Sequence, residues 1–289
     1  MSARQGWLHA PQRREQMAFW MLRLALGVVL FPVFFILLYM LVKGLPGITW
    51  EFLTQPPRSG MRAGGIFPAI IGTLCLVIGT IAVALPLGVL AAIYLNEYAH
   101  PSRWTRFIRL AIINLAGVPS VVYGLFGLGF FVTFLRFGTS IAAGSLTLAI
   151  MSLPVIITAS EEALRSVPQS FREVAYSLGA TRWQMVQTAV LPYALPGILT
   201  GAILGLSRAA GETAPILFTV AAFYLPRLPH SIFDQAMALP YDLYVLATQV
   251  PHVPARVTYG TALVLVALVV CLNLAAIVIR AHYRKVRQW

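Results

Sequence analysis

The sequence predicts an all-α polytopic membrane protein with six transmembrane helices. Hydrophobic residues make up 59% of the 289 residues, charged residues only 10%, and the mean hydropathy is +0.80. A water-soluble domain carries about 25% charged residues. Six apolar segments reach the roughly 20 residues that a helix needs to cross the hydrocarbon core, and no strand-like alternation of about ten residues recurs, which disfavours a barrel. The six segments are 18–42, 66–94, 107–134, 139–160, 189–222 and 258–280.

The basic residues indicate the orientation of the chain. The formal net charge is +12, with 21 Lys and Arg residues. With the N-terminus in the cytoplasm, 14 of those 21 fall on inside segments, six on outside segments, and Arg208 within a span. This asymmetry is the one that the positive-inside rule describes. We therefore expect cytoplasmic N- and C-termini, and the charge does not require a nucleic-acid partner.

The chain divides into two tails, a first span with its loop, and a main helical domain. Residues 1–17 are polar and basic, which predicts a cytoplasmic tail. The apolar run that follows is too long for a signal peptide, and no small-x-small cleavage pattern precedes Lys43. An uncleaved first helix and a Pro- and Gly-rich periplasmic loop are expected over 18–65. The other spans form a transmembrane domain over 66–280, and 281–289 is a second cytoplasmic tail.

Prolines and glycines mark the second and third spans. Pro86 lies late in the second span, where its missing N–H predicts a kink. The third span has Pro119 in its path and continues as GLFGLGFF, with Gly124, Gly127 and Gly129. Small residues at such intervals allow two helices to approach closely in lipid. The close approach is either within this chain or at an interface with another subunit.

A polar interruption separates the fourth and fifth spans. It covers residues 161–185, reads EEALRSVPQSFREVAYSLGATRWQM, and is called the knob below. Two pairs in the knob have capping-box spacing, and one glycine is a natural helix stop. Two short, well-defined helices are therefore predicted on the cytoplasmic side, where a folded polar element indicates a docking site for another protein. The residues concerned are Ser170 with Glu173, Thr181 with Gln184, and Gly179.

The fifth span carries two ionisable residues deep in an apolar segment. Arg208 and Glu212 are four residues apart, so they share one helix face and can pair. A charge near the bilayer centre costs at least about 2.5–3.5 kcal/mol. An Arg facing an aqueous path would also attract a tetrahedral oxyanion by bidentate hydrogen bonding. Both a role in a translocation pathway or gate and a structural ion pair are consistent with this pattern.

The outside loop before the last span is predicted to contain a further helix. Residues 223–257 are rich in Pro and aromatic residues and are predicted to include a short amphipathic helix at the membrane surface.

The sequence contains no P-loop for ATP. A P-loop requires G-x-x-x-x-G-K-[ST], whereas the two lysines, Lys43 and Lys285, are preceded by Val and Arg. ATP hydrolysis is therefore expected on another chain, and we expect no catalytic residue, metal ligand or cofactor in this one.

The segment EVAYSLGATRWQMVQTAVLP, residues 173–192, resembles the coupling motif of type I ABC importer permeases. The residues that match the motif are Glu173, Ala175, Gly179, Leu191 and Pro192, while Val174 and Ala189 replace the family's Ala and Ile. The resemblance implies a MetI-like permease core with a cytoplasmic coupling helix that docks in a groove of an ATPase subunit. It assigns residues 161–192 as the coupling region, with Ser170 at the start of the helix.

Four further motifs resemble the PstA family of phosphate-transport permeases. They are GGIFPAIIGTL at 64–74, PSVVYGLFGLGFF at 119–131, RAAGETAP at 208–215 and ALPYDLYVLAT at 238–248. The resemblance covers about residues 18–280. It implies a channel-forming subunit of an ATP-driven phosphate importer in the inner membrane. The implied partners are a second, PstC-like permease, two ATPase subunits, and a periplasmic or lipoprotein phosphate-binding protein.

Three alternatives remain open at the level of sequence. A permease for sulfate or molybdate would share the coupling motif. A secondary carrier would work without ATP, although such carriers commonly show internal repeats or broken helices near the midplane, and the coupling motif would then have no purpose. A membrane scaffold that senses phosphate status would transport nothing. Co-purification with an ATPase subunit separates the importer from the last two.

Overall fold

The computed structural model describes the backbone of residues 6–286 and the side chains of residues 15–283. Within this part of the chain, five helical segments are long and apolar enough to cross a membrane, and a sixth candidate is a bent pair of helices. The polytopic helical class is confirmed. The five segments are Glu15–Gly47, Phe67–Tyr98, Ile141–Arg165, Arg182–Gly211 and Ala255–Tyr283.

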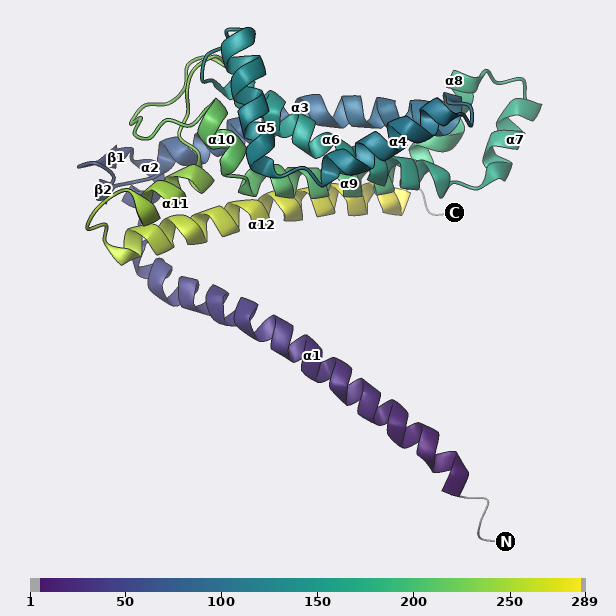
Figure 1. The fold of residues 1–289 in the computed structure, drawn as a ribbon, viewed down its shortest axis with the longest axis horizontal. Coiled ribbons are helices and arrows are strands. Elements are labelled where there is room, and N and C mark those ends of the chain that lie inside the picture. Colours follow the sequence, from purple (N-terminus) through teal and green to yellow (C-terminus); the bar gives the residue numbers. More distant parts are fainter. Residues whose placement is uncertain (1–5, 287–289) are drawn as a thin grey trace.

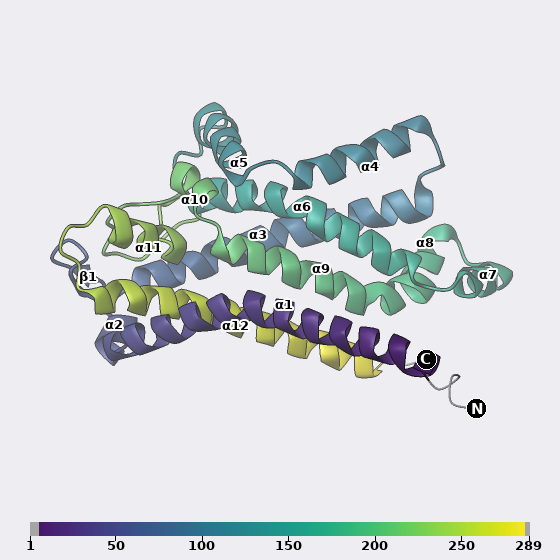
Figure 2. The same cartoon turned by 60° about the horizontal axis from the view of Figure 1, so that its bottom comes forward.

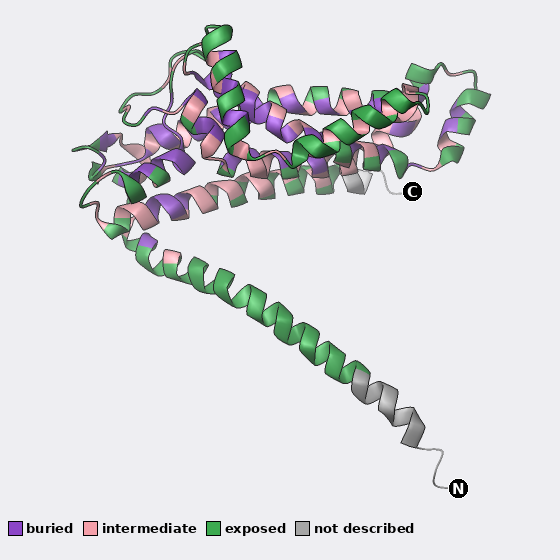
Figure 3. Cartoon of the chain, in the orientation of Figure 1, coloured by how far each residue is buried: buried purple, intermediate pink, exposed green. Residues whose placement is uncertain are grey.

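Three helices form the centre of the bundle. They are α3 (Phe67–Ile93), α6 (Ile141–Arg165) and α9 (Leu191–Gly211), which run side by side in both views (Figures 1 and 2). Glycines allow the close approach: a Cβ added at Gly88 would lie 2.6 Å from Ile156, and one added at Gly201 would lie 2.7 Å from the Cβ of Ala159. Because lipid supplies no hydrophobic force between helices, such close packing holds them together. The central helix α6 is the most buried of the spans (Figure 3).

The first helix leaves the bundle almost entirely. Helix α1 (Gly6–Gly44) meets α12 (Ala255–Val286) only near its C-terminal end, where Tyr39 packs edge-on against Tyr259. From there α1 diverges from the body, and its described side chains are exposed along almost the whole length (Figures 1 and 3). An apolar helix with this exposure is covered by lipid or by a second subunit.

The predicted third span, 107–134, lies in the bent pair of helices. The segment is two helical pieces, α4 (Arg103–Ala116) and Ser120–Phe134, bent by 101°. The second piece is α5 (Ser120–Gly127) followed by a π-helical turn, η3 (Leu128–Phe134). Pro119 caps α5, and the residue before a proline is disfavoured in helical conformation, so the first helix ends at this point.

The glycine run in α5 packs mainly within this chain. A Cβ at Gly124 would lie 2.7 Å from Phe218 of α10 (Ala214–Thr219), and one at Gly127 would collide with Thr147 of α6. These two positions confirm the intramolecular reading of the small-residue spacing. Gly129 has no atom within 4 Å of an added Cβ, so it faces open space in this chain.

The predicted fifth span, 189–222, is also interrupted. Helix α9 ends at Gly211, Glu212 is extended (φ −77°, ψ 135°), and the short α10 follows. Pro215 in the first turn of α10 has no N–H to continue the helical hydrogen bonds of α9. At the other end, α9 is continuous with α8 (Arg182–Met185) through the π-helical turn η4 (Val186–Val190), so this span begins inside the knob.

The end of the bundle opposite α7 and α8, called the outer end, is closed by short elements (Figure 1). They are α2 (Trp50–Thr54), the antiparallel pair β1 (Pro57–Arg58) and β2 (Ala63–Gly64), and α11 (Leu239–Thr248). The predicted helix in the 223–257 loop exists as α11, but it does not lie on the surface. Its residues Leu239 and Val245 are fully buried, and the N–H of Leu239 donates to Thr73 Oγ1 at 2.9 Å.

Candidate functional site

The knob projects beyond the end of the helical bundle. It consists of the end of α6, helix α7 (Gln169–Ser177) and α8, and α7 is the outermost element at that end (Figure 1). The described C-terminal end of α12 lies at the same end of the bundle. The structure therefore contains the two short helices that the sequence predicts, with α8 forming the first turn of a long span.

The first predicted capping box is wrong, and the second is confirmed. Pro168 is the N-cap of α7, with extended geometry and no side-chain cap, so Ser170 is already inside the first turn. Proline fixes φ near −65°, which prepares the chain to enter a helix. At α8 the box forms: Gln184 N–H donates to Thr181 Oγ1 at 3.3 Å, and Thr181 N–H donates to Gln184 Oε1 at 2.8 Å.

Gly179 terminates α7 as predicted. Its φ is +79°, in the left-handed region that favours glycine. The N–H of Gly179 donates to the Tyr176 carbonyl at 2.9 Å, and the N–H of Ala180 donates to the Ala175 carbonyl at 3.1 Å. This pair of bonds is the Schellman arrangement, which satisfies carbonyls that a helix end leaves free. The turn therefore has one defined geometry.

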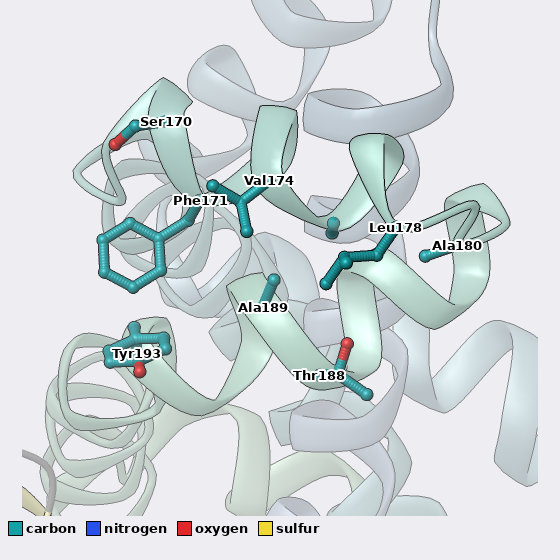
Figure 4. A pocket seen from close by; sticks show the side chains of 9 residues that line it. Ser170, Phe171, Val174, Leu178, Ala180, Thr188, Ala189 and Tyr193 are labelled. Atoms are coloured by element: carbon teal, nitrogen blue, oxygen red, sulfur yellow. The ribbon is translucent and has the colours of Figure 1, made fainter.

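The two halves of the predicted coupling region come together around an apolar groove (Figure 4). Its cavity volume is about 430 Å³. Phe171 on α7 packs edge-on against Tyr193 on α9, with ring centroids 4.6 Å apart. Val174 is 59% exposed and Leu178 is 83% exposed on the outer side. The lining residues are Ser170, Phe171, Val174, Ala175, Leu178, Ala180, Thr188, Ala189 and Tyr193.

The remaining predicted coupling residues occupy different surroundings. Ala175 is buried at the base of α7, whereas Glu173 is exposed. Leu191 and Pro192 form the first turn of α9, directly after the π-helical turn, and the N–H of Leu191 donates to the Val186 carbonyl. Proline is well placed in the first turn because its missing N–H has no helical partner there.

Sequence reasoning missed the residue that anchors the knob. Arg172 is 9% exposed, and its guanidinium binds both carboxylate oxygens of Glu97, at 2.7 and 3.2 Å. It also donates to the carbonyls of Leu164 and Val167, at 2.9 and 2.8 Å. The sequence indicates only the helix face: Arg172 lies three residues before Ala175, so both side chains share one face of α7. It does not indicate the partner, Glu97, which is 75 residues away.

Arg208 and Glu212 do pair, but at the end of a helix. Arg208 Nε lies 3.6 Å from Glu212 Oε1, and the side chains are 33% and 19% exposed. Because α9 ends at Gly211, Arg208 occupies its last turn, where a cation complements the helix dipole. The pair lies at the opposite end of α9 from the knob. The length of α9 therefore separates Arg208 and Glu212 from the coupling residues.

A second buried charge was also missed, near the outer end. Asp242 on α11 is 2% exposed, and neither carboxylate oxygen has a hydrogen-bond partner among the described residues. A cavity of about 10 Å³ adjoins it, enough for about one water. Burial raises the pKa of this carboxyl from 3.8 to about 7.

A bundle of long apolar helices with a folded polar knob at one end is the architecture of a multi-pass membrane protein. The chain belongs to the family of binding-protein-dependent transport system inner membrane components, whose family model matches residues 84–288. It is therefore a multi-pass membrane permease subunit, as the coupling motif predicted.

Three relatives cover most of the chain. The probable ABC transporter permease protein YqgI of Bacillus subtilis (strain 168) is 36% identical over 82% of this chain and 85% of its own length. The phosphate transport system permease protein PstA 1 of Mycobacterium tuberculosis (strain CDC 1551 / Oshkosh) is 36% identical over 88% of this chain and 84% of its own. The PstA protein of Xylella fastidiosa (strain Temecula1 / ATCC 700964) is 34% identical over 81% of each chain.

Solved structures confirm the fold class. A chain of a bacterial alginate ABC transporter, in complex with its alginate-bound periplasmic protein, has a TM-score of 0.68 at 16% identity, over 91% of this chain and 93% of that one. A chain of the inward-facing MetNI methionine ABC transporter has a TM-score of 0.58 at 20% identity, over 76% and 94%. The MetI-like permease fold is the predicted one.

Proposed function

We propose that this chain is the channel-forming permease subunit of an ATP-driven importer of inorganic phosphate. The observation that carries the substrate is the similarity to phosphate transport permeases, at 34–36% identity over 81–88% of this chain. The partners are ATPase subunits, a phosphate-binding protein outside the membrane, and a second permease that completes the pathway. Hydrolysis takes place on the ATPase subunits, since this sequence contains no P-loop.

The coupling residues would act through the geometry of the knob. Exposed Leu178 and Val174 beside the apolar groove offer an ATPase subunit a surface that water solvates poorly. The turn at Gly179 and the cap at Thr181 fix the shape of that surface. Docking on a rigid element transmits a displacement that a flexible loop would absorb. In this role the coupling residues are Ser170, Glu173, Ala175, Gly179, Leu191 and Pro192.

Both termini are placed in the cytoplasm in this proposal. The described end of α12 and the knob lie at the same end of the bundle (Figure 1). The excess of basic residues on inside segments supports the same orientation. The outer end, closed by α2 and α11, then faces the phosphate-binding protein.

Uptake by the purified complex tests the function directly. In vesicles that contain this chain with its co-purifying ATPase and permease partners, we expect phosphate uptake that requires both ATP and the binding protein. Sulfate and molybdate at the same concentration as phosphate serve as competitors. Competition by either anion at equal concentration would assign the pathway to another oxyanion, and uptake without ATP would identify a secondary carrier.

Arg208 and Glu212 are proposed to act in the pathway or its gate. Their side chains keep partial exposure, and the separation of 3.6 Å leaves the guanidinium free to bind an anion. For Arg208→Gln we expect uptake to fall roughly tenfold or more, because a hydrogen bond to a charged group contributes about 1.5–3 kcal/mol. Phosphate uptake is measured in complexes matched for assembly.

The matched control for that variant is Arg280→Gln. Arg280 belongs to α12 and donates to Thr200 Oγ1 at 3.1 Å, so it is a second arginine with a side-chain partner in the spans. We expect the control to retain uptake. Wild-type uptake by Arg208→Gln would leave Arg208 with a structural role alone.

A further inference from the structure

The cytoplasmic end of α3 meets the coupling helix at one buried contact. Glu97 lies in the π-helical turn η2 (Tyr94–Tyr98), which continues α3. The side chains of Glu97 and Arg172 are 6% and 10% exposed, so the pair is shielded from water and from counter-ions. Two parallel N–H···O bonds fix the angle as well as the distance between them.

The same guanidinium also closes the end of α6. The last carbonyls of a helix have no partner within the helix. Arg172 donates to the carbonyl of Leu164 in the last turn of α6 and to that of Val167, two residues beyond its end. One side chain on α7 therefore contacts the ends of both α3 and α6. These two helices make the most extensive helix–helix contact among the described residues, so a displacement of α7 would reach the centre of the bundle directly.

A second arginine also contacts η2. Arg109 on α4 donates to the Leu95 carbonyl at 2.8 Å and pairs with Glu161 on α6, also at 2.8 Å. Both Arg109 and Arg172 therefore bond to η2. A π-helical turn has a widened hydrogen-bond pattern and frequently marks a functional site. It can change its register without breaking the helix that precedes it.

We propose that the Glu97–Arg172 pair is the positioning contact that transmits movement of the coupling helix to α3 and α6. This inference rests on the proposed transport function and deepens it, because it names the route from the knob into the bundle. Arg172 and Glu97 act through the helices they join and are not assigned any contact with phosphate. A purely stabilising pair would instead lower assembly and uptake together.

Arg172→Lys separates the two roles. Lysine keeps the positive charge opposite Glu97 but cannot bind both oxygens and two carbonyls at once. We expect assembly and ATP hydrolysis to persist while phosphate transported per ATP hydrolysed falls roughly tenfold, within the range of about 5–150-fold that is typical of coupling between sites. The matched control is Arg280→Lys, since Arg280 also bonds to a residue of another helix, Thr200 Oγ1 at 3.1 Å, but lies outside the knob.

The measurement uses the complete complex in vesicles. Equal phosphate-to-ATP ratios in wild type and Arg172→Lys would overturn the linkage, as would a fall of the same size in Arg280→Lys. Loss of assembled Arg172→Lys complex, with an unchanged ratio in the fraction that assembles, would assign the pair to stability alone. A wild-type complex that hydrolyses ATP without moving phosphate would instead overturn the proposed function.

A second readout does not depend on phosphate. Cys75 lies on α3 and is partly exposed. We expect ATP to change its rate of labelling by a membrane-permeant maleimide in the wild-type complex, and to leave that rate unchanged in Arg172→Lys. The same ATP-dependent change in both proteins, or no change in the wild type, would show that movement of the knob does not reach α3 through this pair.

Discussion

Two buried carboxylates, at opposite ends of the molecule, have opposite surroundings. Glu97, at the end of the bundle with the knob, accepts two N–H donors of buried Arg172. Asp242, at the outer end, is 2% exposed, and neither of its oxygens has a partner among the described residues. A buried charge is tolerated only when it is paired, and an unpaired group binds a proton instead. The end of the bundle with the knob therefore holds an ion pair, whereas the outer end holds a carboxyl whose pKa burial raises to about 7.

The largest expected effect comes from leaving Glu97 without its partner. For Arg172→Ala we expect a loss of about 3–5 kcal/mol in unfolding free energy, because removal of one member of a buried pair leaves an uncompensated charge. Reversible unfolding in lipid–detergent micelles measures this. The double variant Glu97→Leu, Arg172→Met is the control, and it should recover much of the loss. A single variant as stable as wild type would show that water reaches Glu97.

Asp242 gives the next largest effect, with a defined dependence on pH. Its pKa is raised in the folded protein from 3.8 to about 7, so folding retains a proton that the unfolded chain releases. The contribution of Asp242 to the free energy of unfolding is therefore highest below pH 4, falls as the pH rises to about 7, and is constant above that. The difference between the two pKa values corresponds to roughly 4 kcal/mol at alkaline pH.

Asp242→Asn should remove this pH dependence. At pH 8 we expect the variant to be about 2 kcal/mol more stable than wild type, since the amide carries no charge but still costs about 1–3 kcal/mol for its unpaired polar atoms. At pH 4 the order should reverse, with the variant roughly 2 kcal/mol less stable than wild type, because wild type gains roughly 4 kcal/mol between pH 8 and pH 4 and the variant gains nothing. Unfolding curves of both proteins at pH 4, 6 and 8 measure this, and parallel curves would show that Asp242 has a partner in solution.

The smallest effect tests the shape of the knob. Gly179 has a φ of +79°, and no atom lies within 4 Å of an added Cβ. Gly179→Ala should cost about 1–2 kcal/mol through backbone strain alone, while Gly179→Asn should cost less because asparagine tolerates this conformation. We expect phosphate transported per ATP to fall in the order wild type, Asn, Ala. An equal ratio in all three would remove the turn from the coupling site.

The predictable features were those whose cause is local. The apolar runs predicted the spans. Gly179 predicted the end of α7, and the Thr181–Gln184 spacing predicted the start of α8. The helix boundaries that differ from the sequence-based prediction also have local causes, all of them prolines. Pro168 took the cap position assigned to Ser170, and the chain breaks beside Pro119 and Pro215, where the predicted spans were continuous.

By itself, the sequence determined the class of protein, the position of the knob and the absence of a P-loop, because each depends on composition or on residues a few positions apart. Only the tertiary structure paired Glu97 with Arg172, which are 75 residues apart, and left Asp242 without a partner among the described residues. Neither fact has a local signature. Whether a buried charge is paired depends on which distant segment packs against it, and packing is a property of the folded chain.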